Sequence, residues 1–428
     1  MSQLYRGLGA KLFSPRFGFY LFVCAVGFTY GILPFYLYSY GGASEYFLQL
    51  SLLTVVAILA LFSGYMLPVL DGQFVPGAPR VILSSRLFNF VVWAFFFIFA
   101  FYTFYTAPSI PLLSAIQGAG ADDLSQQRGD FFKGRSGFEA VLLYLSTIFT
   151  TVLIPYSLVL MFLNGSALRY LFLLVAFAFC ISFLQKSLFL NVFMPVMVCF
   201  ALSGRLSFKA LVICMALAVL LLLAAVFISL GGGGSGASFA ESTPLAEYFS
   251  ATYLPSGGGD YFIWRAFAVP LFTATDTLQV HAEIFKGDCL MGATSLLLSL
   301  LTGAERINIE RYVFQHQFGS WNEIANANAV FITDAFVNFG WPGVVLFSML
   351  IGQVFRWFRL SKDIAFKSLW PVFAFTLFSA SLIGMLISNG FVYMLLHALL
   401  IRVNLGAGNR AIAGDQVDSS SVQKVHVE

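Results

Sequence analysis

The fold is decided by long apolar stretches such as residues 170–202, which read YLFLLVAFAFCISFLQKSLFLNVFMPVMVCFAL and contain a single charge, Lys186. A helix that crosses a hydrocarbon core of about 30 Å needs about 20 apolar residues. The stretch therefore predicts two spans joined by a short turn at Gln185-Lys186-Ser187. Over all 428 residues, 59% are hydrophobic and 10% are charged. This composition excludes a set of soluble globular domains, because too few polar groups are present to cover their surfaces.

Similar runs on both sides of residues 170–202 predict about ten spans. The first run, Phe17 to Tyr38, has no small-residue cleavage site and exceeds the core of about 7–15 residues found in signal peptides, so it is expected to be an uncleaved anchor. We expect kinks at Pro34, Pro155 and Pro195, inside spans. The fold class predicted is an all-α, polytopic integral membrane helix bundle of about 10–11 transmembrane helices. The expected spans are 17–39, 47–70, 86–107, 138–163, 169–185, 187–203, 209–230, 328–356, 370–387 and 389–403.

The distribution of basic residues predicts the topology. Cytoplasmic loops of membrane proteins are rich in Lys and Arg, and a cytoplasmic N-terminus places most short basic connections on the cytoplasmic side. These are Arg80 and Arg86, Arg169, Arg205 and Lys209, the cluster from Arg356 to Lys367, and Arg402 with Arg410. Two longer loops, 108–137 and 231–327, are then expected on the outer side, and both termini in the cytoplasm.

Four segments follow from this topology. We expect an N-terminal transmembrane bundle over 1–230, with about seven spans and the outer loop 108–137, and a large outer loop over 231–327. The C-terminal spans occupy 328–403, and a polar, disordered cytoplasmic tail occupies 404–428. Within the large loop, helical patterning covers Tyr261 to Ile284 and Leu290 to Arg311.

Composition also limits the ligands. A net charge of +3 over the chain is no footprint of nucleic-acid binding. Four of the five Cys fall inside apolar runs and only Cys289 lies in a polar stretch; because none has a closely spaced Cys or His partner, a small buried hydrophobe is the usual role, and no metal site is expected.

Lys186 is the first candidate for chemistry, because a cation inside an apolar run is costly unless an anion matches it. The natural anion in the outer leaflet is a lipid phosphate or pyrophosphate. The alternative is that the side chain reaches the interface and is only solvated.

The large outer loop supplies further candidates. Arg265 beside Trp264, and Arg306 with Arg311, are suited to clamp a phosphate, while amides such as that of Asn328 and an indole face are suited to a sugar. Arg128 lies in the smaller loop. His316 or Glu323 is a candidate base for a sugar hydroxyl. The alternative for each charged residue is solvation or pairing with a neighbouring acid.

Asp334 lies in the outer half of the span that begins near Asn328, where burial of a carboxylate carries the same cost as burial of Lys186. It is a third candidate base, and the alternative is a structural pair with a basic loop residue. The following Gly340-Trp341-Pro342-Gly343 is expected to allow a close approach between helices.

With these motifs, the chain resembles the Wzy-type family of bacterial O-antigen and exopolysaccharide repeat-unit polymerases. The likeness rests on Ile110-Pro111-Leu112-Leu113 before Arg128, the Lys186-Ser187 turn, Trp264-Arg265 with Pro270, and Asn328 through Gly343. It implies a GT-C-like bundle in the bacterial inner membrane. The implied activity is metal-independent glycosyl transfer without a cofactor, using polyprenyl-pyrophosphate-linked oligosaccharide repeats and releasing undecaprenyl pyrophosphate.

The resemblance also implies membrane lipids and a chain-length regulator, a polysaccharide co-polymerase, as candidate partners. It supports Arg128, Lys186 and Arg265 as substrate-binding residues, whereas Arg306, Arg311 and His316 rest on the chemistry of the loop. Related O-antigen ligases carry a His where this chain has Asn326 and Asn328, which favours polymerase over ligase, although His316 a little upstream keeps the ligase as an alternative. A lipid-linked oligosaccharide flippase and a non-catalytic scaffold of an envelope complex are two further functions that the same architecture would fit.

Overall fold

The computed structural model describes residues 9–75, 77–132, 134–135, 137–184, 186–204, 213, 216, 245–295, 299, 303, 305–320, 326–328 and 330–404. For residues 121, 122, 125, 138 and 186–189 it describes only the backbone. The protein is mostly helical, and five helical segments in the described residues are long and apolar enough to cross a membrane. They are Pro15–Tyr40, Glu45–Met66, Ser85–Tyr105, Val141–Leu163 and Phe331–Leu360. These five lie where the sequence predicts spans.

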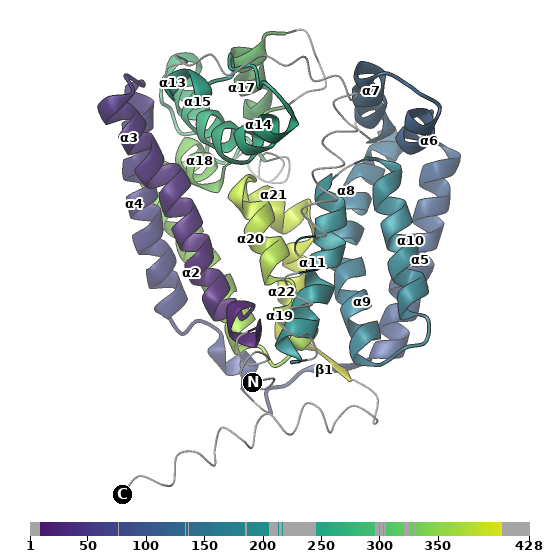
Figure 1. The fold of residues 1–428 in the computed structure, drawn as a ribbon. Helices are drawn as coiled ribbons and strands as arrows, with labels where there is room; N and C mark the ends of the chain where they lie inside the picture. Colours follow the sequence, from purple (N-terminus) through teal and green to yellow (C-terminus); the bar gives the residue numbers. More distant parts are fainter. Residues whose placement is uncertain are drawn as a thin grey trace, which may run out of the picture.

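The long helices run side by side between two ends of the molecule (Figure 1). On one side stand α2 (Pro15–Val26), η1 (Gly27–Ile32), α3 (Leu33–Tyr40), α4 (Glu45–Met66) and α18 (Phe331–Leu360). On the other stand α5 (Ser85–Tyr105), η3 (Gly137–Ala140), α8 (Val141–Ile148), η4 (Phe149–Leu153), α9 (Ile154–Leu163), α10 (Arg169–Ser182) and α11 (Lys186–Leu202). Between them lie α19 (Ile364–Lys367), α20 (Trp370–Phe378), α21 (Leu382–Ile387) and α22 (Phe391–Leu400).

Short helices cover one end of the bundle, which we call the loop end. They are α6 (Pro111–Ile116), α7 (Ala121–Phe132), α13 (Leu245–Tyr248), α14 (Gly258–Ile263), η5 (Trp264–Ala268), α15 (Val269–Ile284) and α17 (Ile309–Phe318). The opposite end, the strand end, carries η2 (Asp71–Phe74), β1 (Val81–Ser84) and β2 (Ile401–Asn404). Both predicted outer loops therefore lie at the same end of the molecule.

Three π-helical turns share one cause. The turns η1, η4 and η5 each end two residues before a proline, namely Pro34, Pro155 and Pro270. Proline lacks an N–H, and its ring clashes with the carbonyl four residues earlier. Widening the turn before it relieves the clash and redistributes the hydrogen bonds. Pro195 instead lies inside the uninterrupted helix α11.

Helices α4 and α18 cross in close contact at two glycines. A Cβ atom on Gly64 would collide with the backbone of Met349, and one on Gly352 would collide with the backbone of Leu61. This is the close approach that small residues permit. The sequence predicts a close approach between helices at Gly340 to Gly343 instead, and that prediction was wrong. Those glycines instead serve a break inside α18, where Gly340 has φ 63° and ψ −155°.

The strand end departs from the all-α prediction. The expected span 389–403 ends as a helix at Leu400, and Ile401–Asn404 continue as β2, parallel to β1 with Ile82 opposite Arg402. The expected span 370–387 is divided into α20 and α21. Apart from residues 213 and 216, the expected span 209–230 lies outside the described residues, as do the Gly-rich start of the large loop and the tail from 405.

The large loop is helical where the pattern predicts it over 261–284, because α14, η5 and α15 are consecutive. The helix predicted over 290–311 is only partly confirmed: residue 299 and residues 309–311 are helical, whereas residues 291–294 form turns, residues 305–308 are irregular, and α17 begins at Ile309. The side chain of Asn308 caps α17 by accepting a 3.2 Å hydrogen bond from the Arg311 N–H. Asn is favoured at such caps, which explains the start of the helix there.

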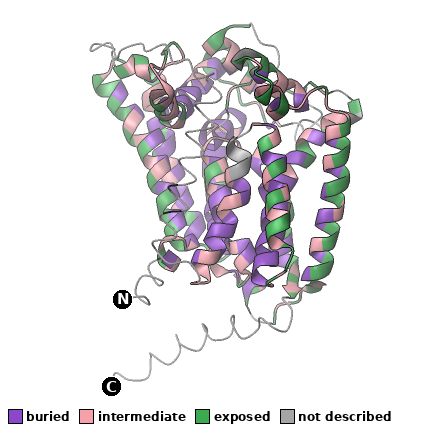
Figure 2. Ribbon diagram, turned by 45° about the vertical axis from the view of Figure 1, so that its right-hand side comes forward, coloured by how far each residue is buried: buried purple, intermediate pink, exposed green. Residues whose placement is uncertain are grey.

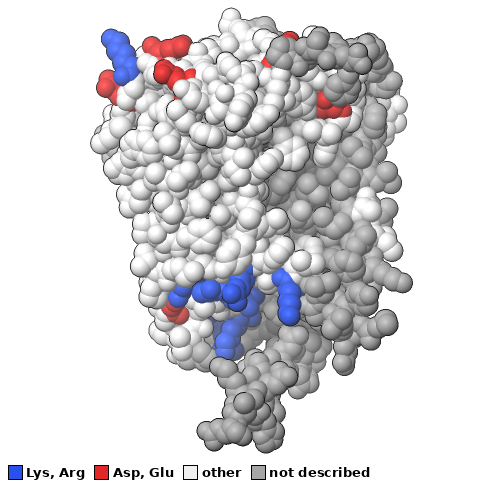
Figure 3. Space-filling model, turned by 60° about the vertical axis from the view of Figure 1, so that its left-hand side comes forward, with Lys and Arg blue, Asp and Glu red and all other residues white. Residues whose placement is uncertain are grey.

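Buried and exposed residues are distributed as in a helix bundle. Purple buried residues face its interior and green exposed ones its outside (Figure 2). Many exposed residues are large and apolar, for example Phe90, Ile98 and Phe101 along α5. Figure 3 shows Lys and Arg gathered at the strand end of the face it draws, with most acidic side chains at the loop end. A broad apolar surface between two charged ends suits a helix bundle surrounded by lipid.

Candidate functional site

A buried carboxyl group lies beneath the loop end, in the first turn of α18. The Asp334 side chain is 5% exposed. Its Oδ1 accepts hydrogen bonds from the hydroxyl of Thr294 at 3.2 Å and from Nδ2 of Asn338 at 3.1 Å. Its Oδ2 is buried and has no hydrogen-bond partner among the described residues. A buried polar atom without a partner is costly, and such atoms are common where a ligand or a proton is handled.

The break in α18 explains how Thr294 reaches this carboxyl. Pro342 has no N–H, so the carbonyl of Asn338 loses its helical partner, and the N–H of Met291 donates to that carbonyl at 2.9 Å instead. Likewise, the N–H of Leu290 donates to the carbonyl of Val337 at 3.0 Å. Residues 290–291 thus pair with the interrupted helix like a short strand.

The side-chain amide of Asn338 connects the loop segment 290–294 to α18. Its Nδ2 donates to the Thr294 hydroxyl at 2.8 Å as well as to Asp334, and its Oδ1 accepts from the N–H of Gly292 at 3.0 Å. The Asn338 side chain is fully buried. A buried amide with its polar atoms engaged fixes the positions of its neighbours. Asn338 therefore holds the loop segment over Asp334.

A second carboxyl group, Glu310, stands beside the first. It lies in the first turn of α17, next to Ile309, and Ile309 and Val313 pack with Val337 of α18 in one apolar cluster. The main chain adds a link, since the carbonyl of Glu310 accepts from the N–H of Ala327 at 3.0 Å. Glu310 and Asp334 interact electrostatically. Burial raises the pKa of Glu310, while the charge of Arg306 opposes that rise. Glu310 is half-buried, so unlike Asp334 it is partly accessible.

A third carboxyl group links α15 to α17. Oδ2 of Asp276 accepts a 2.7 Å hydrogen bond from Nε2 of Gln317. Burial raises the pKa of Asp276 to about 6, although this hydrogen bond and the nearby His316 both lower it. His316 itself is exposed, in the last turn of α17.

The predicted phosphate-binding arginines of the large loop are exposed. The described residues form two ion pairs, Arg135 with Glu139 and Arg356 with Asp71, and neither includes Arg265, Arg306 or Arg311. Pairing of these arginines with neighbouring acids is thus not found in the described part of the chain. Arg128 is half-buried, and its Nε donates to the carbonyl of Leu124 in its own helix at 3.2 Å.

The structure brings together only part of the predicted set. Trp264, Arg265, Arg306, Arg311, His316, Asn328 and Asp334 all belong to the group of elements α14, η5, α15, α17 and α18 and the segments that join them. Arg128 on α7 and Lys186 at the start of α11 belong to the other side of the loop end (Figure 1). The side chain of Lys186 and the whole of Glu323 lie outside what the structure describes.

Trp264 differs from its predicted role. Its ring is 6% exposed and lies against Phe272, Tyr261 and Tyr253, with ring centroids 5.7, 6.3 and 6.4 Å away. The indole face is therefore covered by protein and is not open to a sugar ring. Asn328, in contrast, is exposed beside the N-terminus of α18.

Sequence reasoning missed Glu310, Thr294 and Asp276 as members of the site. The sequence suggests Glu310 only as a partner for arginine. Its position three residues after Ile307, whose N–H donates to the carbonyl of Ala293 at 3.0 Å, depends on a contact between distant segments. Such a contact leaves no local signal in the sequence.

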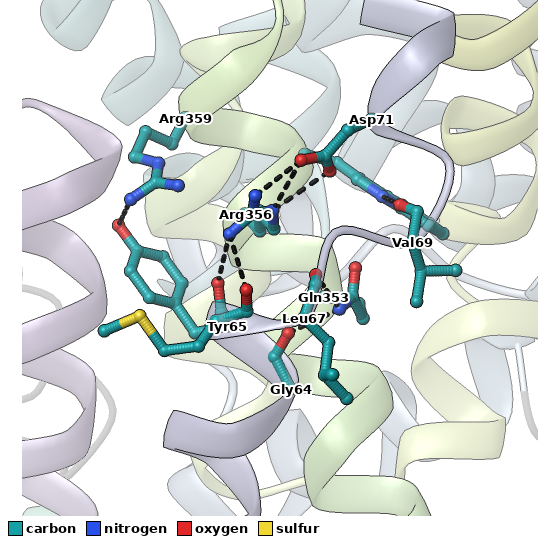
Figure 4. Close-up of polar contacts among 10 residues, drawn as sticks. Gly64, Tyr65, Leu67, Val69, Asp71, Gln353, Arg356 and Arg359 are labelled. Atoms are coloured by element: carbon teal, nitrogen blue, oxygen red, sulfur yellow. Dashed lines mark hydrogen bonds and ion pairs between the residues drawn. The ribbon is translucent and has the colours of Figure 1, made fainter.

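Sequence reasoning also missed polar contacts at the strand end. The guanidinium group of Arg356 pairs with Asp71 and donates to the carbonyls of Tyr65 and Met66, both at 3.0 Å. Gln353 donates to the carbonyls of Gly64 and Leu67 (Figure 4). These groups satisfy the last carbonyls of α4, which have no helical partner of their own. Their role is to lock α4 to α18.

Comparison with known proteins returns no match, whether the chain is compared with family models, curated proteins or solved structures. Among the described residues, no group of three His, Cys, Asp or Glu side chains is placed to hold a metal ion. The chemistry of the loop end must therefore be judged from its own residues.

Proposed function

We propose that this protein is a polytopic inner-membrane glycosyltransferase that polymerises polyprenyl-pyrophosphate-linked oligosaccharide repeats, with undecaprenyl pyrophosphate as the leaving group. The single observation that carries the proposal is the combination at the loop end of exposed arginines, which form no ion pair with a described residue, and a coupled pair of carboxyl groups, Glu310 and Asp334. In this proposal both termini are cytoplasmic, so the loop end faces the outer side.

The arginines suit the donor. As the bond from the anomeric carbon to the pyrophosphate breaks, its electron pair leaves with the pyrophosphate and negative charge grows on the phosphate oxygens. Guanidinium groups bind such oxygens bidentately. Arg265, Arg306 and Arg311 are free for this task, because no described carboxylate forms an ion pair with them. Arg128 and Lys186, at the same end, are proposed to bind the second lipid-linked substrate.

The carboxyl pair suits the acceptor. An acceptor hydroxyl must lose its proton as its oxygen attacks the anomeric carbon and forms the new glycosidic bond. Glu310, which was not among the bases suggested by the sequence, is half-buried and interacts with a second acid, and its raised pKa increases its basicity as a carboxylate. We assign the base role to Glu310, with the buried Asp334, on which the charge of Glu310 acts, behind it. His316, an exposed residue in the last turn of α17, is less well placed.

The proposal is tested by a gel ladder of surface glycan from a deletion strain complemented with wild type, Arg265→Ala or Arg306→Ala. Lys11→Ala, an exposed cation near the strand end, is the matched control. Expression of each variant is confirmed by immunoblot. We expect deletion to leave single-repeat glycan, the control to restore the ladder, and the two arginine variants to restore little of it.

Different outcomes would identify different functions. If deletion removes all surface glycan and traps lipid-linked repeats on the cytoplasmic face, the protein is a flippase. If deletion instead leaves full-length polymer on its lipid carrier, the protein is a ligase. Either result would replace the polymerase proposal.

A further inference from the structure

Four cations lie at the strand end in the region of Asp363. Arg80 precedes β1, Lys362 precedes α19, Lys367 ends α19, and Arg402 lies in β2; we call these four residues the strand-end cluster. Arg80 interacts electrostatically with Arg402 and Asp363, and Lys367 with Asp363 and Lys362. Arg80 and Lys367 thus both interact with Asp363, and the cluster carries an excess of positive charge.

Asp363 offsets only part of the charge of the cluster, because it supplies one negative charge for four cations and its oxygens accept hydrogen bonds from other groups. Oδ2 accepts a 2.6 Å hydrogen bond from the Tyr156 hydroxyl, and Oδ1 accepts one of 2.8 Å from the N–H of Ala365. Neither of the ion pairs among the described residues involves Asp363 or any member of the cluster. The four cations therefore have no counter-ion within contact distance in the described part of the chain.

The parallel strands direct two of these cations to one face. Arg402 stands opposite Ile82 in the register, and Arg80 is two residues before Ile82. Side chains two apart in an extended chain lie on the same face. Arg80 and Arg402 are therefore neighbours with like charge.

Arg80 is held in place, yet it is not fully satisfied. One of its terminal nitrogens donates to the carbonyl of Gln73, and its guanidinium lies 5.6 Å from the centre of the Phe74 ring. Its Nε is buried without a hydrogen-bond partner among the described residues. Burial lowers the pKa of Arg80, Arg402 adds to that effect, and Asp363 opposes it. An anion between the two arginines would give the buried Nε of Arg80 a partner and would offset the repulsion between the two positive charges.

We propose that the strand-end cluster is a binding site for a phosphate group, and that its occupant is the headgroup of an anionic phospholipid. Guanidinium groups match phosphate oxygens in geometry as well as charge. The surroundings favour a lipid over free phosphate, because Val81 and Ile82 on β1 expose 66% and 67% of their surface beside the cluster. Apolar side chains next to cations suit the boundary between headgroups and acyl chains.

The test is thermal unfolding of the purified full-length protein in detergent with added dioleoyl phosphatidylglycerol, dioleoyl phosphatidylcholine or inorganic phosphate. Arg402→Gln and Arg80→Gln are compared with Lys11→Gln, which removes an exposed charge outside the cluster. Arg402 is exposed, so its replacement should fold even if that of Arg80 does not. Lipid affinity is taken from the dependence of the melting temperature on lipid concentration.

We expect phosphatidylglycerol to raise the melting temperature of the wild type, and phosphatidylcholine and phosphate to have little effect. Each arginine variant should bind phosphatidylglycerol about fivefold more weakly, the effect expected of one basic residue near an anionic surface, and Lys11→Gln should bind like wild type. Equal stabilisation by inorganic phosphate would identify a free-anion site and overturn the lipid assignment. Undiminished affinity in Arg402→Gln, or the same loss in Lys11→Gln, would overturn the site itself.

Discussion

Tyr156 and Asp363 are 207 positions apart in the chain, and the Tyr156 hydroxyl donates a 2.6 Å hydrogen bond to the half-buried Asp363 carboxylate. Nε2 of His397 lies 3.1 Å from the same hydroxyl oxygen. Because the hydroxyl proton is directed to Asp363, the Nε2–H of His397 donates to the oxygen, which assigns the tautomer of the ring. Helices α9 and α22 and the start of α19 are thus tied at one point.

Tyr156→Phe removes the hydroxyl group that ties these three helices together. The substitution deprives Asp363 and His397 of their shared partner, and an unsatisfied buried group costs about 1–3 kcal/mol. We expect the melting temperature in detergent to fall accordingly. Tyr393→Phe is the control, because the Tyr393 hydroxyl is 3.5 Å from Nδ1 of His397 and the side chain is 40% exposed. Equal losses in the two variants would contradict the assigned role of Tyr156.

Gly64→Ala tests the crossing of α4 and α18. The added methyl group would collide with the backbone of Met349, which cannot move as a side-chain tip can. Overpacking of this kind costs about 1–3 kcal/mol. Gly72→Ala, where a Cβ meets nothing within 4 Å, should have little effect. Thermal unfolding of both variants measures the difference, and a stable Gly64→Ala protein would show that the helices separate easily.

Asp276→Asn tests the acid that links α15 to α17. Its pKa of about 6 in the folded protein, against 3.8 when unperturbed, means that the folded state retains the proton to a higher pH than the unfolded state does. The protonated acid therefore contributes stability below pH 3.8, and this contribution is lost as the pH rises through about 6. The loss is at most about 3 kcal/mol.

Asn keeps an oxygen for Gln317 and does not titrate. Asp276→Asn should therefore flatten the fall in stability between about pH 4 and pH 6, and should be as stable as wild type or more so at neutral pH, as measured by unfolding at each pH. Glu283→Gln, which alters an acid paired with Gln279 at the exposed surface, should keep the wild-type pH dependence. An unchanged pH profile in Asp276→Asn would rule out this acid as its source.

Glu310→Gln and Asp334→Asn separate the two carboxyl groups. If Glu310 is the base, Glu310→Gln should lower polymerisation in purified membranes by about 10²-fold or more, the usual contribution of a base. Asp334→Asn, which alters only the acid behind the proposed base, should retain more activity. Glu305→Gln, an exposed acid just before α17, should behave like wild type. If Glu305→Gln loses as much activity as Glu310→Gln, the assignment fails while the polymerase proposal stands.

Much of the helix bundle could be predicted because membrane spans leave a long, local signal. Five predicted spans coincide with helices of sufficient length and hydropathy, and the helix over 261–284 followed from its pattern. The wrong predictions concern places where a helix is interrupted. The strand 401–404 and the break at Gly340 depend on partners, β1 and residues 290–291, that lie far away in the sequence.

The sequence by itself determined the class of fold, because the length and apolar character of each helix are local properties of consecutive residues. It also identified Asp334 and the loop arginines as unusual, because charge in such surroundings is conspicuous. Only the tertiary structure decided which of them act together. It placed Glu310 beside Asp334, enclosed Trp264, and joined Tyr156 to Asp363, since each of these contacts arises from the packing of segments that no short-range pattern relates.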